Sequence, residues 1–264
     1  MQNPDICDVM KRLRHLFSAF ASRQAEASFE FDAPLRPDIP FCAIGDIHGS
    51  LPALELLLSK IEALPQVPSV ICVGDYLDRG EQSAQVLDWL QRLCRDFGDG
   101  FVCLRGNHEQ MCLDFLENPE EQGEFWLRHG GLQTLASYGI ARVPGLTSYR
   151  EVRDRLAEAM GPDLINWIAT RPLSWQSGNV VVVHAGMDPA LSLAQQRDSV
   201  LTWGHPDFEM VPRRDGLWVV HGHTVVPEPS VSAGRIAIDT GAYATGRLTA
   251  AHVSRDGVTF LENL

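Results

Sequence analysis

Polar side chains that could do chemistry follow five short apolar segments of the sequence. The clusters are Gly45-Asp46-Ile47-His48-Gly49, Gly74-Asp75-Tyr76-Leu77-Asp78-Arg79-Gly80, Gly106-Asn107-His108-Glu109, His184-Ala185-Gly186 and His221-Gly222-His223-Thr224. Each contains glycine, which permits tight turns and close approach of the backbone. Together they offer carboxylates, an amide and imidazoles, the groups that proteins use to bind metal ions and to move protons.

The donor atoms of these clusters predict a metal centre. Two carboxylates, one amide and three imidazoles are available, from Asp46, Asp75, Asn107, His48, His184 and His223. Mixed nitrogen and oxygen donors without sulfur suit Mn, Fe or Zn in a catalytic site rather than a structural zinc site. Six donors exceed the need of one open ion and suit two ions roughly 3.5–4 Å apart, bridged by a carboxylate.

A structural interpretation competes with the metal centre at each cluster. A single Gly-Asp after a strand is usually a turn or a helix cap, and a single histidine usually has a structural role. Five clusters at successive strand ends are harder to explain in that way. Grouped carboxylates without a metal ion would repel one another and would lose several kcal/mol of hydration each. The five clusters together therefore favour the metal centre over a structural role.

The elements that must position these clusters alternate along the chain. Apolar runs at 40–44, 70–73 and 101–104 are typical of strands, and segments 51–64 and 82–97 have helical spacing. This order predicts βαβ units and a parallel sheet, with ligands at the carboxyl ends of its strands.

The rest of the chain predicts helices and then further strands. Residues 108–170 are expected to be mostly helical. The last third contains predicted strands at 179–183, 217–220, 235–238, 248–253 and 258–261. Their short connections predict an antiparallel second sheet.

The N-terminal region differs from the remainder. Apolar positions three or four residues apart predict a helix over 5–27, and three prolines follow between Pro34 and Pro40. We therefore divide the chain into residues 1–38, an N-terminal helix with a Pro-rich linker, and a single domain over residues 39–264. We expect the apolar face of this helix to be packed, whether on the domain, over the active site or in a dimer.

Composition excludes several classes of function. The 264 residues include 34 acidic and 22 basic side chains, a formal charge of −12, which disfavours nucleic acid as a partner. We find no apolar run long enough to span a bilayer and no secretory signal, so we expect a cytoplasmic protein without a membrane partner. The six cysteines form no C-x-x-C pair and are expected to be reduced thiols.

The motifs GDIHG, GDYLDRG, GNHE, HAG and GHT, followed by IDTGA at 238–242, resemble the PPP family of metallophosphatases. The likeness is to its bacterial and phage branch, within the calcineurin-like metallophosphoesterase superfamily, and it covers residues 40–250. It implies an α/β fold with a central two-sheet β-sandwich of mixed strands flanked by helices. It also implies two divalent or trivalent metal ions as cofactors.

The resemblance assigns roles to the motif residues. It implies that the first metal is held by Asp46, His48 and Asp75, and the second by Asp75, Asn107, His184 and His223. His108 would protonate the leaving group, Asp78 would hold His108, and Arg79 and Asn107 would bind the substrate phosphate. His221 is expected to be a core or supporting residue.

One position departs from the family pattern. His205 stands where bacterial members carry an arginine that clamps the phosphate. Either His205 gives a weaker, pH-dependent clamp, or Arg213 or Arg214 substitutes from nearby. We therefore predict His205 as a phosphate-binding residue.

The sequence as a whole predicts a metal-dependent phosphomonoester hydrolase. The resemblance points to a protein phosphatase for Ser/Thr or for both Ser/Thr and Tyr, with in-line attack by hydroxide on the metal ions and no phosphoenzyme. Its partner would be a phosphorylated protein or a small phosphomonoester. The alternatives are a dinucleoside polyphosphate hydrolase, a small-molecule phosphatase and a non-catalytic metal-binding module. The sequence does not indicate an oligomeric state.

Overall fold

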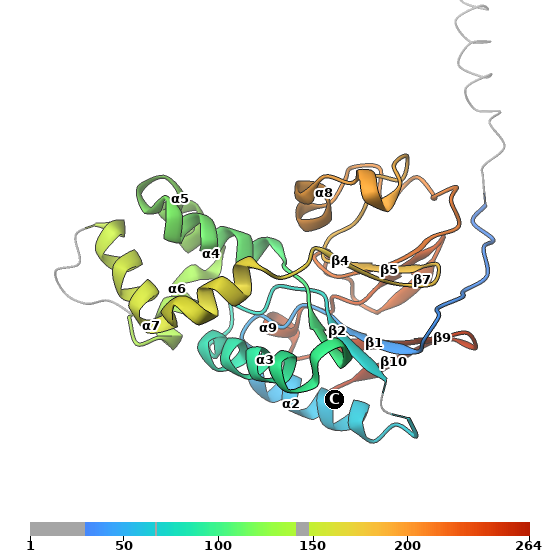
Figure 1. The fold of residues 1–264 in the computed structure, drawn as a ribbon, viewed down its shortest axis with the longest axis horizontal. Helices are drawn as coiled ribbons and strands as arrows, with labels where there is room; N and C mark the ends of the chain where they lie inside the picture. The colour runs from blue at the N-terminus through green and yellow to red at the C-terminus, as the bar shows by residue number, and fades with distance from the viewer. Residues whose placement is uncertain (1–29, 67, 141–147) are drawn as a thin grey trace, which may run out of the picture.

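The computed structural model describes residues 30–66, 68–140 and 148–264. The predicted helix at 5–27 lies outside the described residues. The described part consists of two five-stranded sheets with helices on their outer faces and a larger group of helices to one side (Figure 1). The predicted α/β fold with a central sandwich of mixed strands is confirmed.

The first sheet has the order β10-β9-β1-β2-β3. Its strands are β1 (Phe41–Ile44), β2 (Ser69–Cys72), β3 (Phe101–Cys103), β9 (Thr249–Ser254) and β10 (Gly257–Glu262). The strands β1, β2 and β3 are parallel, as predicted, and are joined through α2 (Leu51–Glu62) and α3 (Ser83–Phe97). Strand β9 runs antiparallel to β1, with Phe41 opposite Val253.

The second sheet has the order β4-β5-β6-β8-β7. Its strands are β4 (Ser174–Ser177), β5 (Val180–Val183), β6 (Trp218–His221), β7 (Ser230–Ser232) and β8 (Arg235–Ala237). Strands β5, β6 and β8 are parallel, and only the two edge strands are antiparallel.

The prediction of an antiparallel second sheet was therefore wrong in two respects. Its centre is parallel, because the segment between β5 and β6 is long enough to cross over and contains α8 (Asp198–Trp203). The run of four buried valines in β5 is typical of a parallel strand that is covered on both faces. The last two predicted strands, β9 and β10, extend the first sheet instead.

Three apolar clusters define the layers. One lies between the two sheets and includes Phe41, Ile71, Val182 and Val220. A second joins the other face of the first sheet to α2, α3 and the helical group, and a third packs Leu201 of α8 against the second sheet. The two sheets therefore share one core, which fixes the positions of their strand ends relative to each other.

The helical group follows β3, as the sequence predicts for residues 108–170. It comprises α4 (Asn107–Glu117), α5 (Pro119–Trp126), a π-helical turn η2 (Leu127–Gly131), α6 (Leu132–Ser137) and α7 (Tyr149–Ala169). Short elements complete the chain, namely η1 (Gly98–Gly100), η3 (Leu193–Gln195) and α9 (Ala242–Thr245). No helix of the described residues is long and apolar enough to cross a bilayer.

The extended segment before β1 is attached to the second sheet. The side chain of Asn179 accepts from Arg36 N at 2.7 Å and donates to Pro34 O at 2.9 Å. Trp218 Nε1 donates to Ala33 O, and Ser177 Oγ accepts from Asp38 N and Ile39 N. The predicted linker is thus held along its length by the sandwich, whereas the domain boundary at residue 39 stays a prediction.

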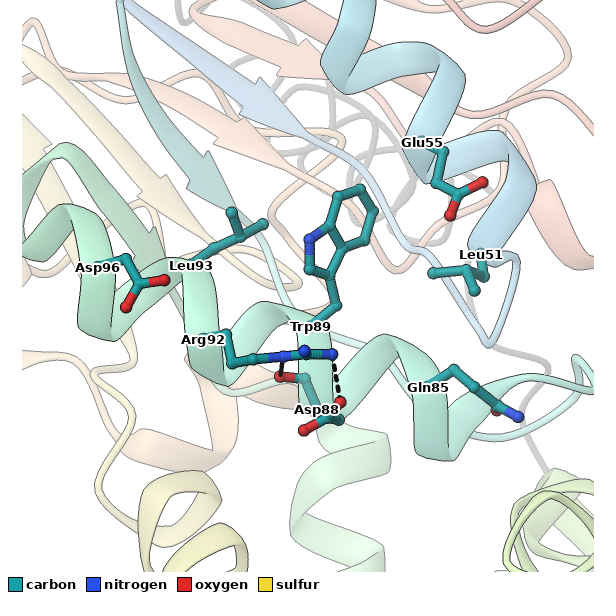
Figure 2. Close-up of a pocket in the computed structure, with 8 residues that line it drawn as sticks. All are labelled: Leu51, Glu55, Gln85, Asp88, Trp89, Arg92, Leu93 and Asp96. Atoms are coloured by element: carbon teal, nitrogen blue, oxygen red, sulfur yellow. Dashed lines mark hydrogen bonds and ion pairs between the residues drawn. The ribbon is translucent and has the colours of Figure 1, made fainter.

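A shallow hollow of about 520 Å³ lies between α2 and α3. Figure 2 shows the side chains that line it, with Trp89 near its centre and Arg92 bonded to Asp88 of the same helix. None of the predicted site residues lines this hollow. The volume of a hollow therefore does not by itself identify the active site.

Replacing Asn179 with alanine should release the segment before β1. The variant removes hydrogen bonds to Arg36 and Pro34, and a third that Asn179 Nδ2 donates to Gly216 O. We expect the free energy of unfolding to fall by about 1–3 kcal/mol, measured by urea denaturation. The control Asn166→Ala lies exposed on α7 and should change it by less than about 0.5 kcal/mol. Equal stabilities for the two variants would contradict the attachment.

Candidate metal centre and active site

The carboxyl ends of five strands bring the predicted donors together. Asp46 and His48 follow β1, and Asp75 follows β2. Asn107 begins α4 directly after the β3 turn, while His184 and His223 follow β5 and β6. Parallel strands end at the same edge, so residues remote in sequence meet there.

Asp75 lies at the middle of the cluster. Its Oδ2 is 3.5 Å from His48 Nε2, and its Oδ1 is 3.4 Å from His184 Nε2. The two carboxylate oxygens therefore face imidazoles that come from different sheets. This is the arrangement expected of a bridging ligand.

The side-chain oxygen of Asn107 lies close to the imidazoles of His184 and His223. It lies 2.8 Å from His184 Nε2 and 3.0 Å from His223 Nδ1. One ligand atom each from Asp75, His184 and His223 lies within 4.8 Å of the others, and the same holds for His48, Asp75 and His108. These two groups share Asp75.

Asp46 approaches the cluster from the end of β1. Its carboxylate accepts from the backbone N–H of His223 at 3.1 Å, and it belongs to neither of the two groups above. The carboxylate is buried, and burial, then the charges of Asp239 and Asp75, raise its pKa well above the usual value. The sequence singled out the IDTGA motif without giving Asp239 a role.

The chemistry of this cluster fits a metal ion. His48 Nε2, which faces Asp75 Oδ2, is buried without a hydrogen-bond partner. Burial lowers the pKa of His184 to about 3 and that of His223 to about 4, so both rings are neutral, as metal ligands must be. Crowded carboxylates beside neutral imidazoles are what a bound cation would stabilise.

Asp78 and His108 form a buried pair beside the donors. His108 Nδ1 lies 2.7 Å from Asp78 Oδ2, and His108 Nε2 is 3.9 Å from Asp75 Oδ2. Asp78 also accepts from Trp126 Nε1 at 3.0 Å and from Thr134 Oγ1 at 2.6 Å. The sequence missed Trp126 and Thr134, because nothing in the motifs points to α5 or α6.

Burial changes the pKa values of this pair in opposite directions. It lowers the pKa of His108 to about 4 and raises the pKa of Asp78 well above its usual value. Both shifts favour the uncharged forms of the two side chains.

Glu109 links the turn after β2 to the turn after β3. Its carboxylate accepts from three backbone N–H groups, those of Asp75 at 2.8 Å, Tyr76 at 2.7 Å and Gly106 at 2.9 Å. The turns after β2 and β3 therefore move as one unit. The GNHE motif was noticed in the sequence, but this role of Glu109 was not.

Backbone strain is concentrated at this site. Six non-glycine residues among those described have positive φ, and five of them are His48, Asp75, Asp78, Arg79 and His223. Such conformations cost about 1–3 kcal/mol each and persist only where the surroundings enforce them. The strain therefore marks the same residues as the motifs do.

Arg79 is placed beside the donors without a carboxylate partner. Its guanidinium lies over the ring of Tyr243, 4.8 Å from the centroid. Within the described ranges, no acidic side chain forms an ion pair with it. The arginine is therefore available for an anion.

His205, the remaining predicted phosphate-binding residue, lies on the segment after α8. Its Nε2 lies 3.6 Å from Asp188 Oδ2, on the segment that follows β5. The guanidinium of Arg213 bonds to Asp215 and to the carbonyls of Asp188 and Leu191, so it is not available as a phosphate clamp. His221 packs against Phe208 in the core, with 4.9 Å between the rings.

Comparison with known proteins identifies the family. Residues 39–227 match the calcineurin-like phosphoesterase family. The chain belongs to this family. The resemblance seen in the motifs is thereby confirmed at the level of the family, and the phosphoesterase class is a class of hydrolases.

Curated relatives of this phosphoesterase fall into two kinds. The chain is 28% identical to serine/threonine-protein phosphatase 2 of Salmonella typhimurium, over 78% of the chain and 89% of that protein. It is 29% identical to the asymmetrical bis(5'-nucleosyl)-tetraphosphatase PrpE of Anoxybacillus flavithermus, over 78% and 87%. A symmetrical tetraphosphatase of Methylococcus capsulatus is 30% identical, but the match spans only 43% of that protein.

Solved structures share the fold of this phosphoesterase. A cold-active protein-tyrosine phosphatase from a Shewanella species has a TM-score of 0.55 at 19% identity, over 88% of this chain and 83% of that one. A crystal structure provisionally assigned as a diadenosine tetraphosphatase has a TM-score of 0.60 at 19% identity, over 89% and 98%. At these identities the likeness concerns the fold.

Substituting Gly222 with alanine should weaken metal binding. A Cβ there would lie 1.9 Å from Asp46 Oδ1, which would displace the carboxylate. We expect the affinity for Mn²⁺, measured by isothermal titration calorimetry, to fall roughly 10–100-fold, as when a metal ligand loses its support. Gly100→Ala is the control, because its Cβ would meet nothing closer than 3.9 Å. Unchanged affinity in a folded Gly222→Ala variant would contradict the assignment of Asp46.

Proposed function

We propose that this protein is a phosphomonoester hydrolase that depends on two metal ions and acts on phosphorylated proteins. The observation that carries the proposal is the buried Asp78–His108 pair, whose free Nε2 lies 3.9 Å from the carboxylate of Asp75. A proton donor beside a metal-binding carboxylate suits a reaction in which an alkoxide must leave.

The two ions would be Mn, Fe or Zn. Asp46, His48 and Asp75 would hold one, and Asp75, Asn107, His184 and His223 would hold the other. When bound, such ions acidify water and polarise the phosphoryl oxygens. The unpartnered Nε2 of His48 and the position of Asp75 between the sheets support this division.

His108 would give its proton to the leaving oxygen. A dianionic phosphoester beside Nε2 would favour the doubly protonated ring, because an opposite charge within about 4–6 Å favours the charged form. Asp78, fixed by Trp126 and Thr134, would keep the ring oriented. Substrate binding would therefore favour the charged form of His108, from which the proton is given.

Arg79 and Asn107 would hold the substrate phosphate. The guanidinium offers two parallel N–H donors, which match two phosphoryl oxygens. Its stacking on Tyr243 and its lack of an acidic partner support this role. His205, on the segment after α8, would assist in holding the phosphate.

One relative, a serine/threonine-protein phosphatase, is matched over 89% of its length. This match favours proteins phosphorylated on serine or threonine as the substrate class. Bis(5'-nucleosyl)-tetraphosphate hydrolysis is the second candidate, because the asymmetrical enzyme is matched over 87% of its length. Asp78 favours the first, since a protein alkoxide is a poorer leaving group than a nucleoside phosphate and needs a proton donor more.

Replacing His108 with asparagine should abolish turnover without loss of metal. We expect kcat for an alkyl phosphomonoester to fall by roughly 10²–10⁴, with a smaller loss for p-nitrophenyl phosphate, whose leaving group needs little protonation. Metal content is checked by mass spectrometry. The control His252→Asn lies near Ile39 and Pro40, at the other end of β1. Equal losses for both substrates would argue against an acid.

A direct substrate comparison tests the proposed class. The Mn²⁺-loaded protein should hydrolyse a phosphoseryl peptide with a higher kcat/KM than diadenosine tetraphosphate, measured by phosphate release and by chromatography of nucleotides. A preference for the dinucleotide would instead favour the tetraphosphatase. Absence of turnover with either compound and with p-nitrophenyl phosphate would contradict the hydrolase itself.

A further inference from the structure

Strand β10 forms one edge of the first sheet, and its outer side has no partner strand among the described residues (Figure 1). It pairs with β9 over all six of its residues, from Gly257 opposite Ser254 to Glu262 opposite Thr249. The other edge strands of the two sheets, β3, β4 and β7, have three or four residues each. Strand β10 is therefore the longest edge of the described sheets.

The backbone groups of β10 alternate between β9 and the outer side. Asn263, which follows the strand, donates its N–H to Leu248 O at 3.2 Å. Residues opposite each other in an antiparallel pair either exchange both hydrogen bonds or direct both groups away, in alternation. The odd-numbered residues of β10 therefore bond to β9. Val258, Phe260 and Glu262 direct their N–H and C=O groups outward.

Lys60 limits the free part of this edge. Its Nζ, at the end of α2, donates to Glu262 O at 2.7 Å, as expected of a carbonyl that faces outward. In the part of the chain that the structure describes, no hydrogen bond satisfies the outward N–H or C=O of Val258 or of Phe260. Two donors and two acceptors are thus left free on these two residues.

This strand lacks the features with which proteins protect an exposed edge. Charged side chains, proline and bulges are the usual means. From Gly257 to Leu261 the sequence is Gly-Val-Thr-Phe-Leu, without charge or proline, and the pairing with β9 continues without a bulge. An uncharged edge with free donors and acceptors is a template for another strand.

The free groups are complementary to those of a second copy in one register. With Val258 opposite Phe260 of the partner copy, all four free groups on each strand are bonded. Thr259 then lies opposite its own copy at a two-fold axis. Aromatic residues opposite β-branched ones, and threonine opposite threonine, are favourable cross-strand pairs. This register does not need the carbonyl of Glu262, which Lys60 already occupies.

The side chains also fit this pairing. Val258 and Phe260 are half-buried and pack against the apolar cluster between the sheets, so their pairing would extend that layer into the second copy. Thr259 is exposed. At the two ends Asp256 would lie opposite Glu262 of the partner copy, but Arg247 Nε lies 3.7 Å from Glu262 Oε1 and compensates its charge.

We propose that two copies of this protein associate through antiparallel pairing of their β10 strands, with Val258 opposite Phe260, so that their first sheets become one continuous sheet. The donors follow β1, β2 and β3, on the far side of β9 from this edge. The association therefore does not use the site, and the inference does not rest on the proposed function.

Sedimentation equilibrium of the full-length protein tests the association. About 0.15 M salt is used, because it screens the repulsion between two copies of charge −12. The interface is small, so the dimer should dissociate on dilution. We expect the weight-average mass to rise with concentration from 29.2 kDa toward twice that value. A mass that stays at 29.2 kDa at every concentration would overturn the inference.

Charges introduced at Thr259 test the register. Thr259→Lys would place two lysines opposite each other at the axis, and Thr259→Glu two glutamates. Each variant alone should raise the dissociation constant roughly 3–10-fold. An equimolar mixture should recover the wild-type affinity, because opposite charges then face each other. Ser232→Lys on β7, the exposed edge of the second sheet, is the matched control and should leave the dimer unchanged. Weakening by Ser232→Lys, or no recovery in the mixture, would contradict the pairing.

Val258→Pro separates the pairing from the fold. It removes only the outward N–H, so the hydrogen bonds to β9 remain. We expect the dimer to be lost, whereas Val258→Ala keeps the N–H and should keep the dimer. Both variants should retain turnover of p-nitrophenyl phosphate. Equal loss of the dimer in the two variants would contradict hydrogen bonding at this edge.

Other outcomes separate this inference from its alternatives. A dimer that forms only after removal of residues 1–29 would show that the protein's own N-terminal segment covers the edge, which would overturn the inference for the full chain. A dimer without turnover of any phosphoester would overturn the proposed function alone. A monomer with turnover would overturn the inference alone.

Discussion

The burial of several carboxylates at one edge of the sandwich is the constraint on which the site depends. Asp46, Asp75, Glu109 and Asp239 are each almost fully buried, and burial raises the pKa of Asp46, Glu109 and Asp239. Three backbone N–H groups compensate Glu109, whereas Asp46 accepts from one, that of His223, and Asp75 accepts from one, that of His108. Hydrogen bonds leave part of this buried negative charge uncompensated, and a bound cation would neutralise it. Metal binding and the stability of this edge of the sandwich should therefore be coupled.

The local backbone is built to hold these groups at close range. Positive φ at Asp75 and Asp78 directs the turn after β2 toward the other strand ends. Glycines allow the backbone segments to approach one another closely. A Cβ at Gly80 would lie 2.0 Å from His48 O, and one at Gly222 1.9 Å from Asp46 Oδ1. The strain and the close contacts are maintained by the core shared between the sheets, since a packed interior does not yield locally.

An acidic protein can bind an anionic substrate because positive charge is concentrated at the site. The chain has a formal charge of −12, which disfavours nucleic acid over most of its surface. Arg79 is free of an acidic partner in the described part of the chain, and bound metal ions would add further positive charge beside it. A phosphate can therefore be held at one point of an acidic protein.

The sequence by itself determined the family and the α/β class, and it predicted a set of donor residues, because glycine and polar side chains at strand ends are a local pattern. It also predicted the parallel β1, β2 and β3. It did not determine the order of the second sheet, since a strand's partner depends on where the connections cross and not on its own residues. It also missed Trp126 and Thr134, and it gave no role to Glu109 or Asp239. Their roles come from contacts between residues far apart in the chain, which only the packing of the helices and sheets decides.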